Sequence, residues 1–189
     1  MSNYYKGDMT SFYSIEELKE LPIKSFGENV LISRKVSLYG RDIEIGSNVR
    51  IDDYCILSGK IKLGSYIHIG AYCALYGAFG IEMEDFTGLS PRCTVFSATD
   101  DFGGNFLISP MTKKEHTRVS GGLVKIRRYS QIGAACVIMP DVEIAEGTAV
   151  GAMSLINKNT EDWSVYVGVP AAKIKKREKG LLDLIFNYE

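Results

Sequence analysis

Apolar residues recur every six positions along most of the chain. Between residues 126 and 155, successive blocks of six read IRRYSQ, IGAACV, IMPDVE, IAEGTA and VGAMSL, and each block opens with Ile or Val. The fifth position of each block holds a small or β-branched residue. A period of six fits neither an amphipathic helix nor an isolated strand. It predicts a short extended side followed by a corner, repeated, so that the chain coils with its first and fifth positions pointing inward.

The same pattern covers most of the sequence. The first positions are apolar from Phe26 to Val95 and, after an interruption, from Ile126 to Ile156. The frame shifts by one residue near Asp42 and by two near residues 79–80. Three blocks make one turn of a triangular prism, which predicts about six turns stacked at roughly the inter-strand spacing of 4.8 Å.

All four cysteines occupy inward fifth positions, namely Cys55, Cys73, Cys93 and Cys136. A free cysteine in such a slot behaves as a small buried apolar residue. None of the four forms a CxxC pair, which argues against a structural zinc site. We therefore expect neither disulfides nor a metal.

A helix is expected just before the coil begins. Ser14 and Glu17 have the spacing of a capping box, and Pro22 follows the last residue of one apolar face. Such a helix could cover the open end of the coil. At the other end, residues 178–187 can form a final helix, although Gly180 weakens it.

The interruption between residues 97 and 123 is too long for a corner. It contains Asp100, Asp101, a Gly pair and His116. Segments of this length in a compact domain are usually functional or disordered. This excursion is therefore a candidate for part of a binding site.

The composition excludes several classes of protein. The chain has 189 residues and a formal net charge of −1, which gives no electrostatic reason to expect nucleic acid or an anionic membrane as partner. The N-terminus has no apolar segment of a signal peptide, and there is no run of roughly 18 apolar residues. We expect no integral membrane segment, and a cytoplasmic location by default.

The repeat resembles that of the hexapeptide-repeat acyltransferases, particularly sugar O-acetyltransferases. The motifs that carry the resemblance are IGA at 132–134, VGA at 150–152 and YVGVPAAKIK at 166–175. The resemblance implies an all-β, left-handed parallel β-helix with an excursion loop and a short helix at each end. The expected parts are an N-terminal segment (1–25), the β-helix (26–160, with the excursion at about 97–123) and a C-terminal tail and helix (161–189). It also implies a homotrimer with active sites between subunits.

The resemblance further implies acetyl-CoA as co-substrate, without a metal. Small residues at two successive corners would line the groove for its pantetheine arm, and tail residues would flank its adenine end and phosphates. These predicted cofactor-binding residues are Gly133, Ala134, Gly151, Ala152, Pro170, Lys173 and Lys176. Lys175 and Arg177 belong to the same basic cluster. Corner geometry alone also explains the glycines.

The chain has only two histidines as candidate bases. His68 follows the inward Ile67, so the alternation along an extended side points it outward. Histidine can take a proton from a hydroxyl near neutral pH, so we predict His68 as the general base, the alternative being an ordinary surface histidine. His116 is predicted to contact substrate, or else to be a solvated loop residue. Tyr66, Tyr72 and Tyr76 are expected to gather near His68, with Tyr76 binding the substrate.

The excursion departs from the family that it resembles. Sugar acetyltransferases of this type typically carry their catalytic histidine at its start, where this chain reads SATD at 97–100. Ala98 cannot act as a base. Either His68 has taken the role, or an aspartate acts, or the acceptor is more nucleophilic. We predict Asp100 as a second catalytic residue and Asp101 as a substrate ligand.

These residues favour an acetyl-CoA-dependent O-acetyltransferase acting on a sugar or saccharide hydroxyl, of the cell-surface polysaccharide type. The hydroxyl would attack the thioester directly, with a backbone N–H stabilising the oxyanion. One alternative is N-acetylation of an amino-sugar nucleotide, because an amine tolerates a weaker base. Another is a non-catalytic β-helix scaffold. A zinc hydratase of the carbonic-anhydrase type would need three gathered histidines, and the chain has two.

Overall fold

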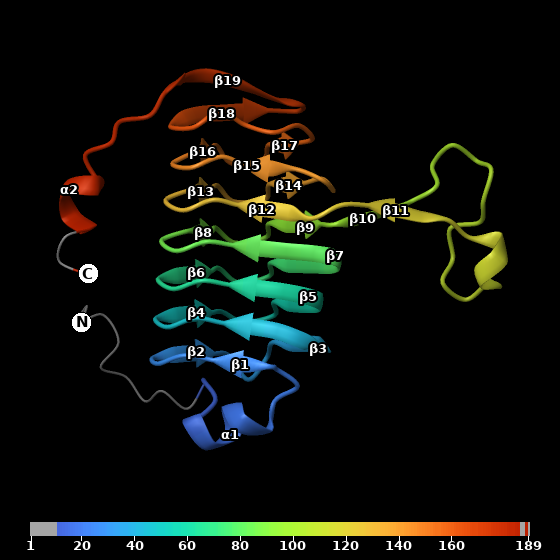
Figure 1. Cartoon of the computed structure of the whole chain (residues 1–189), viewed down its shortest axis with the longest axis horizontal. Helices are drawn as coiled ribbons and strands as arrows, with labels where there is room; N and C mark the ends of the chain where they lie inside the picture. Colours follow the sequence, from blue (N-terminus) through green and yellow to red (C-terminus); the bar gives the residue numbers. More distant parts are fainter. Residues whose placement is uncertain (1–10, 186–187, 189) are drawn as a thin grey trace.

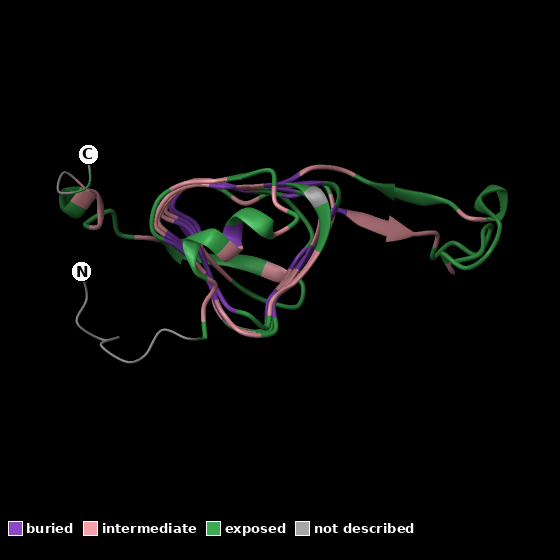
Figure 2. Cartoon of the chain, turned by 90° about the horizontal axis from the view of Figure 1, so that it is seen from below, coloured by how far each residue is buried: buried purple, intermediate pink, exposed green. Residues whose placement is uncertain are grey.

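The computed structural model describes residues 11–185 and 188, apart from the side chain of Arg41. The chain winds into a left-handed parallel β-helix of about seven turns, one more than the period of six suggests. Figure 1 shows the turns stacked on one another, and Figure 2, seen from below, shows their triangular cross-section. The predicted fold class is confirmed.

The described strands form three sheets. One side of the prism is an eight-stranded sheet in the order β19-β18-β16-β13-β8-β6-β4-β2. Its strands are β2 (Val30–Ile32), β4 (Val49–Ile51), β6 (Ile67–Ile69), β8 (Gly88–Leu89), β13 (Gln131–Ile132), β16 (Ala149–Val150), β18 (Ser164–Gly168) and β19 (Ala171–Lys176).

A nine-stranded sheet makes the other two sides. Its strands are β1 (Ser25–Phe26), β3 (Ser37–Ile45), β5 (Ile56–Leu63), β7 (Ala74–Met83), β9 (Thr94–Phe96), β12 (Val124–Ile126), β14 (Val137–Ile138), β15 (Glu143–Ile144) and β17 (Leu155–Ile156). The pairing of β3 with β5 shifts register between Tyr39 and Asp42, where the sequence period also slips.

The inward positions are buried as the period predicts. Ile32, Ile51 and Ile132 have no exposed surface, and the four cysteines are free and buried. Each cysteine thiol also donates a hydrogen bond to the carbonyl oxygen of a corner residue, at 3.1 or 3.2 Å. Burying an aliphatic side chain contributes about 1.5–3 kcal/mol, so this repeated interior is the main source of stability.

One edge of the prism carries a stack of aromatic rings. Tyr66, Phe86, Tyr129 and Trp163 follow one another up this edge, with ring centroids 4.5, 5.8 and 6.1 Å apart. All four have positive φ, between 48° and 65°. We call these four residues the aromatic edge.

The outer face of the nine-stranded sheet carries alternating charges. Glu44, Lys62, Glu82, Lys125 and Glu143 are successive register partners across five strands. Opposite charges directly across parallel neighbours attract, and each such pair contributes roughly 0.2–1 kcal/mol. We call this column the charge ladder.

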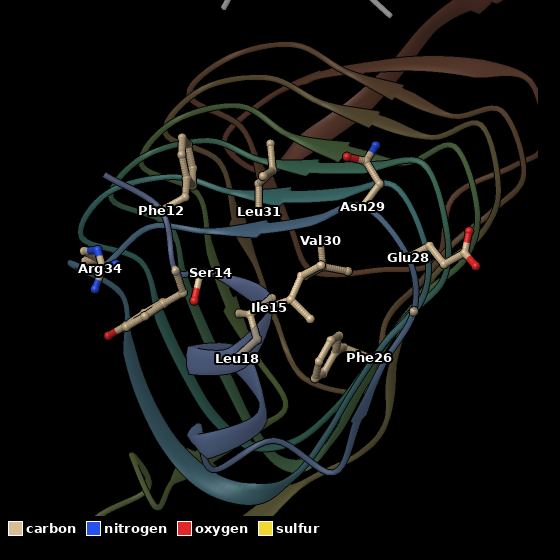
Figure 3. Close-up of a pocket in the computed structure, with 12 residues that line it drawn as sticks. Phe12, Ser14, Ile15, Leu18, Phe26, Glu28, Asn29, Val30, Leu31 and Arg34 are labelled. Atoms are coloured by element: carbon tan, nitrogen blue, oxygen red, sulfur yellow. The ribbon is translucent and has the colours of Figure 1, made fainter. Parts of the chain in front are cut away.

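The lower end of the prism is covered by α1 (Ile15–Glu20). Both hydrogen bonds of the predicted capping box are present, between Ser14 and Glu17, so the expected helix is confirmed. The Arg34 guanidinium, 2.6 Å from the Glu17 carboxylate, lowers the pKa of Glu17 to about 2. Figure 3 shows Leu18 and Val30 facing a hollow of about 740 Å³ between this helix and the first turn.

The upper end closes with an antiparallel hairpin of β18 and β19, followed by α2 (Leu182–Ile185). The expected helix over 178–187 is therefore shorter at its start, because Gly180 lies outside it, and residues 186–187 lie outside the described part of the chain. No helix within the described residues is long and apolar enough to cross a bilayer.

The excursion forms an arm that leaves one edge of the prism. Its base is an antiparallel pair, β10 (Ala98–Asp100) and β11 (Val119–Gly121), and its far part contains the 3-10 helix Lys114–His116. Figures 1 and 2 show the arm pointing away from the coil. No residue from 98 to 123 is buried, and the side chains of Phe102 and Met111 are 87% and 91% exposed.

Candidate active site

A hollow opens on the outer face of the eight-stranded sheet. Register partners place His68 next to Gly88, and Gly88 next to Gln131, across β6, β8 and β13. Because Gly88 has no side chain, a space of about 390 Å³ remains around it, which Ser90 and Tyr66 also line. We call this space the site hollow.

His68 points outward, as the alternation predicts, and its side chain is 58% exposed. Its Nε2 lies 2.8 Å from Oδ2 of Asp52, whose other oxygen accepts a hydrogen bond from Arg50 Nε at 2.7 Å. The carboxylate that orients this imidazole within the chain is thus Asp52 from the turn below. A histidine held in this way retains one ring nitrogen for acid–base chemistry.

Ser90 lies at the corner that follows β8. Its hydroxyl oxygen lies 3.5 Å from Nε2 of Gln131, at the limit of a hydrogen bond. The equivalent corner positions in other turns are Ser33, Asp52, Gly70, Gly133 and Gly151, whose backbone N–H groups bind the same column of carbonyl groups. The period of six therefore gave no signal that singled out Ser90, Asp52 or Gln131.

The predicted coenzyme groove lies on the same edge, directly above Ser90. A Cβ on Gly133 would come within 2.6 Å of the backbone nitrogen of Ala152, and one on Gly151 within 2.7 Å of the Val167 side chain. Turn-to-turn packing therefore requires glycine at 133, where the close atoms are backbone, whereas at 151 only the Val167 side chain would have to move. Ala134 is half-buried and Ala152 is exposed beside them, and the coenzyme role of these residues stays a prediction.

The tail residues have different surroundings from one another. Lys173 Nζ forms an ion pair with Glu161 at 2.6 Å, whereas Pro170 and Lys176 are exposed. Arg177 donates from Nη1 to the carbonyl oxygens of Tyr129 and Gly147, at 2.7 and 2.9 Å. Burial lowers the pKa of Arg177. Arg177 therefore ties the tail to the coil, and a contact between its guanidinium and the coenzyme phosphates stays a prediction.

The three predicted residues of the arm also differ. Asp101 accepts hydrogen bonds from the backbone N–H groups of residues 103, 105 and 106, at 2.8–3.0 Å, and these amides lower its pKa. It shapes the turn of the arm. Asp100 ends β10, and His116 is exposed in the 3-10 helix. Their predicted roles remain predictions.

The three tyrosines expected near His68 belong to three separate stacks. Tyr66 stacks on Phe86, whereas Tyr72 stacks on Tyr54 with centroids 5.0 Å apart. Tyr76 stacks on Phe96, at 5.4 Å. Tyr66 lines the site hollow with His68. The expected cluster is wrong for Tyr72 and Tyr76, because consecutive positions around a turn face different sides of the prism.

The structure does not bring Asp100 to His68 within one chain. Ser90 precedes β9 and the arm follows it, so the whole length of one side separates the site hollow from the base of the arm. Figure 2 shows that the arm then leads farther away. The described residues also contain no group of three or more His, Cys, Asp or Glu side chains suited to a metal ion.

Comparison with known proteins establishes the family, although no family model matches the sequence. The chain is 41% identical over 172 residues to the dTDP-4-amino-4,6-dideoxy-D-glucose acyltransferase of Escherichia coli, covering 89% of this chain and 90% of that protein.

Solved structures agree with this relative. AntD, an N-acyltransferase from Bacillus cereus, is 50% identical, with a TM-score of 0.92 over 96% of this chain and 98% of its own. That structure is a serine variant in complex with dTDP-4-amino-4,6-dideoxyglucose and coenzyme A, and another AntD structure contains dTDP and 3-hydroxybutyryl-CoA. A maltose O-acetyltransferase from Clostridium difficile, 23% identical over 87% of this chain and 75% of its own with a TM-score of 0.57, shares the fold. The protein is thus an acyltransferase and belongs to the hexapeptide-repeat acyltransferase family.

Proposed function

We propose that this protein transfers an acyl group from acyl-CoA to the amino group of a dTDP-linked 4-amino-4,6-dideoxy sugar. The observation that carries the proposal is the similarity, over nearly the whole chain, to an acyltransferase named for that substrate and to AntD. The sequence favoured O-acetylation of a saccharide. The N-acylation alternative now has the better support.

The chemistry of an amine acceptor fits the residues present. An amine attacks a thioester more readily than a hydroxyl does, so it needs less help from a general base. That agrees with Ala98 at the position where sugar O-acetyltransferases carry histidine. The amine nitrogen bonds to the thioester carbon, the carbon–sulfur bond breaks, and the thiolate of coenzyme A takes up a proton. The four cysteines are buried inside the prism, so no cysteinyl intermediate is invoked.

Ser90 and Asp100 are the two residues that we propose to lie nearest the reacting groups. The AntD structures include variants of one serine and of one aspartate that lies ten positions after it. In the present sequence, Ser90 and Asp100 are the only serine and aspartate with this spacing. We assign the Asp100 carboxylate to accept the proton from the attacking amine, and the Ser90 hydroxyl to orient that amine. His68, with Asp52, borders the same hollow and is the alternative base.

A site that uses both Ser90 and Asp100 needs two copies of the chain. One side of the prism separates them within a copy, and the arm that carries Asp100 points outward. The arm of one copy would place Asp100 over the site hollow of the next. Three copies related by a threefold axis, as the family resemblance implies, complete three equivalent sites. The exposed apolar residues of the arm support this assembly.

Coenzyme A is proposed to lie along the edge above Ser90. Gly133, Ala134, Gly151 and Ala152 continue that edge upward, and their small side chains allow the pantetheine arm to approach the backbone. Lys173 and Lys176 would then meet the phosphates, next to Pro170. An acyl group on such an arm ends close to the site hollow, where the acceptor amine is expected.

The direct test compares acceptors that differ in one group. Thiol release from acetyl-CoA and from 3-hydroxybutyryl-CoA is measured with dTDP-4-amino-4,6-dideoxyglucose, and with dTDP-glucose as the hydroxyl control. We expect release with the amino sugar alone, together with the acylated product in its mass spectrum. Release with hydroxyl acceptors only would instead establish O-acylation.

A further inference from the structure

A second hollow adjoins the site hollow. It encloses about 410 Å³ between the aromatic edge and the C-terminal segment. Tyr66, Phe86 and Tyr129 form one wall, and Leu181, Leu184 and Ile185 form another. Tyr66, Phe86 and Gln131 line both hollows. A ligand held in the site hollow can therefore extend directly into this second space, which we call the aromatic hollow.

The residues of the aromatic edge are unusual for their backbone conformation. Lower on the same edge, the left-handed positions hold Asn29 and Asn48, with φ of 52° and 58°. Asparagine adopts this conformation at low cost, whereas a bulky side chain there is an outlier. Tyr66 and Phe86 occupy the next two left-handed positions, with φ of 59° and 57°. The corner conformation itself does not require these rings.

The rings of the aromatic edge present a flat apolar wall. Tyr66 and Phe86 are parallel within 3°. The ring of Tyr188 packs against both, at centroid distances of 5.4 and 6.0 Å and interplanar angles of 75° and 76°. A planar ring therefore fits across their edges, in a geometry that aromatic pairs favour.

A polar group marks the junction of the two hollows. Gln131 is exposed on β13, and its carboxamide offers a donor and an acceptor side by side. Bidentate pairing of such an amide with the edge of a base is a recurrent mode of recognition. Arg128 and Lys179 add positive charge near the aromatic edge, with side chains 6.0 Å from the Tyr129 ring and 5.1 Å from the Trp163 ring.

We propose that the aromatic hollow binds the nucleobase of the sugar nucleotide, with Gln131 pairing with the base. This inference rests on the proposed function. In a nucleoside-diphosphate sugar, only a deoxyribose and a diphosphate separate base and sugar. In coenzyme A, the long pantetheine arm also intervenes before the thioester. Since the two hollows share three residues, the shorter ligand is the one that spans them.

The test replaces single rings without changing the corner. Tyr66→Asn and Phe86→Asn introduce the residue that lower turns already use in this conformation. Tyr54→Asn is the matched control, because Tyr54 also has a positive φ of 61° and stacks on a neighbouring ring, on a different edge. Calorimetry on the full chain measures dissociation constants for dTDP and for coenzyme A. We expect each test variant to weaken dTDP binding about tenfold, to change coenzyme A binding less than twofold, and the control to change neither.

The possible outcomes are distinct. Folded test variants that bind dTDP normally, or that lose coenzyme A instead, overturn the assignment, as does an equal loss in the control. If a test variant does not fold, Tyr188→Ala replaces it, because that side chain is 58% exposed. It should weaken dTDP binding about threefold by the same loss of ring contact, and no change would also overturn the inference. The proposed function fails separately, if the unaltered protein does not acylate the amino sugar.

Discussion

The interior of the prism and the arm both contain large apolar side chains, but they bury them differently. Ile132 has no exposed surface, whereas Met111 and Phe102 in the arm are 91% and 87% exposed. The side chains of the interior are buried entirely by residues of the same chain. The arm has no core of its own, so its apolar residues can be buried only by something outside the chain. Stability and activity should therefore respond to different changes.

Removing the arm should affect activity most. Replacing residues 99–119 with a short Gly/Ser turn removes Asp100 and, by our proposal, one wall of the neighbouring copy's site. We expect acyl transfer to fall about 1,000-fold, since positioning and proton transfer are both lost. Far-UV circular dichroism should still show the β-helix. Loss of that signal would mean that the arm contributes to the fold of the single chain.

A pair of truncations should separate the two regions by stability. Ile132→Ala leaves a cavity in the interior and should lower the free energy of unfolding by about 2–5 kcal/mol. Met111→Ala in the arm should change it by less than about 0.5 kcal/mol. Urea denaturation of each variant measures both, and sedimentation velocity checks whether Met111→Ala weakens assembly. Equal effects on unfolding would contradict the comparison.

Substitution of His68 tests whether a side chain on the outer face of the prism takes part in proton transfer, as Asp100 of the arm is proposed to do. The assignment of Asp100 as the base predicts that His68→Ala lowers kcat less than tenfold and keeps the affinity for acyl-CoA, whereas a loss of tenfold or more would make this imidazole the base. Asp52→Asn should produce a smaller loss in kcat, because it removes only the carboxylate that orients His68. Unchanged turnover in His68→Ala would assign the proton transfer to the arm. Steady-state kinetics with the amino sugar measure both variants.

The cysteine column should make the interior sensitive to alkaline pH. The hydrogen bond with Cys55 and burial raise the pKa of Cys73 to about 12, although its hydrogen bond with Cys93 opposes the shift. For Cys93 the hydrogen bond with Cys136 lowers the pKa, but the hydrogen bond with Cys73 and burial outweigh it and raise the pKa to about 11. The unfolded thiols have a pKa near 9, so this stability is complete below pH 9 and is lost as the pH rises through the folded values.

The urea midpoint should therefore fall as the pH rises above 9. Cys73→Ser and Cys93→Ser should reduce that dependence, and serine is already tolerated next in this column, at Ser154, which donates to the Gly151 carbonyl at 2.7 Å. A pH profile that the two substitutions leave unchanged would exclude the thiols as its cause.

The charge ladder should give the smallest effect. Glu82→Lys places a positive charge between Lys62 and Lys125 and should cost roughly 0.2–1 kcal/mol per pair. The loss should shrink in high salt, because exposed charges are screened. Glu82→Gln is the control, since it removes the attraction without adding repulsion. Thermal denaturation at two salt concentrations measures the difference.

The inward half of the molecule could be predicted from the sequence because it depends only on alternation along each side. That is why the burial of Cys136 and the exposure of His68 followed from the period. The capping box at Ser14 and Glu17 was equally local. Each of these predictions needed only a few consecutive residues.

The outward half could not be predicted, because its neighbours come from the turns above and below. Gly88 lies beside Gln131 because β8 and β13 are neighbouring strands, although the arm separates them in the sequence. The partner of His68 is Asp52 because of the register of β4 and β6. Asp101 binds backbone groups of its own turn, which its residue type did not reveal. A site that needs a second copy of the chain cannot be predicted from the pattern of residues within one chain.

The last strand of the eight-stranded sheet has a consequence for solubility. A stack of parallel turns is open to addition at each end, much as a growing fibril is. β19 runs antiparallel to β18 and carries Lys173, Lys175 and Lys176 in exposed positions. Reversed direction and lysines are both features by which edge strands resist further pairing. The reversed strand and its lysines therefore oppose the addition of further strands at the upper end of the coil.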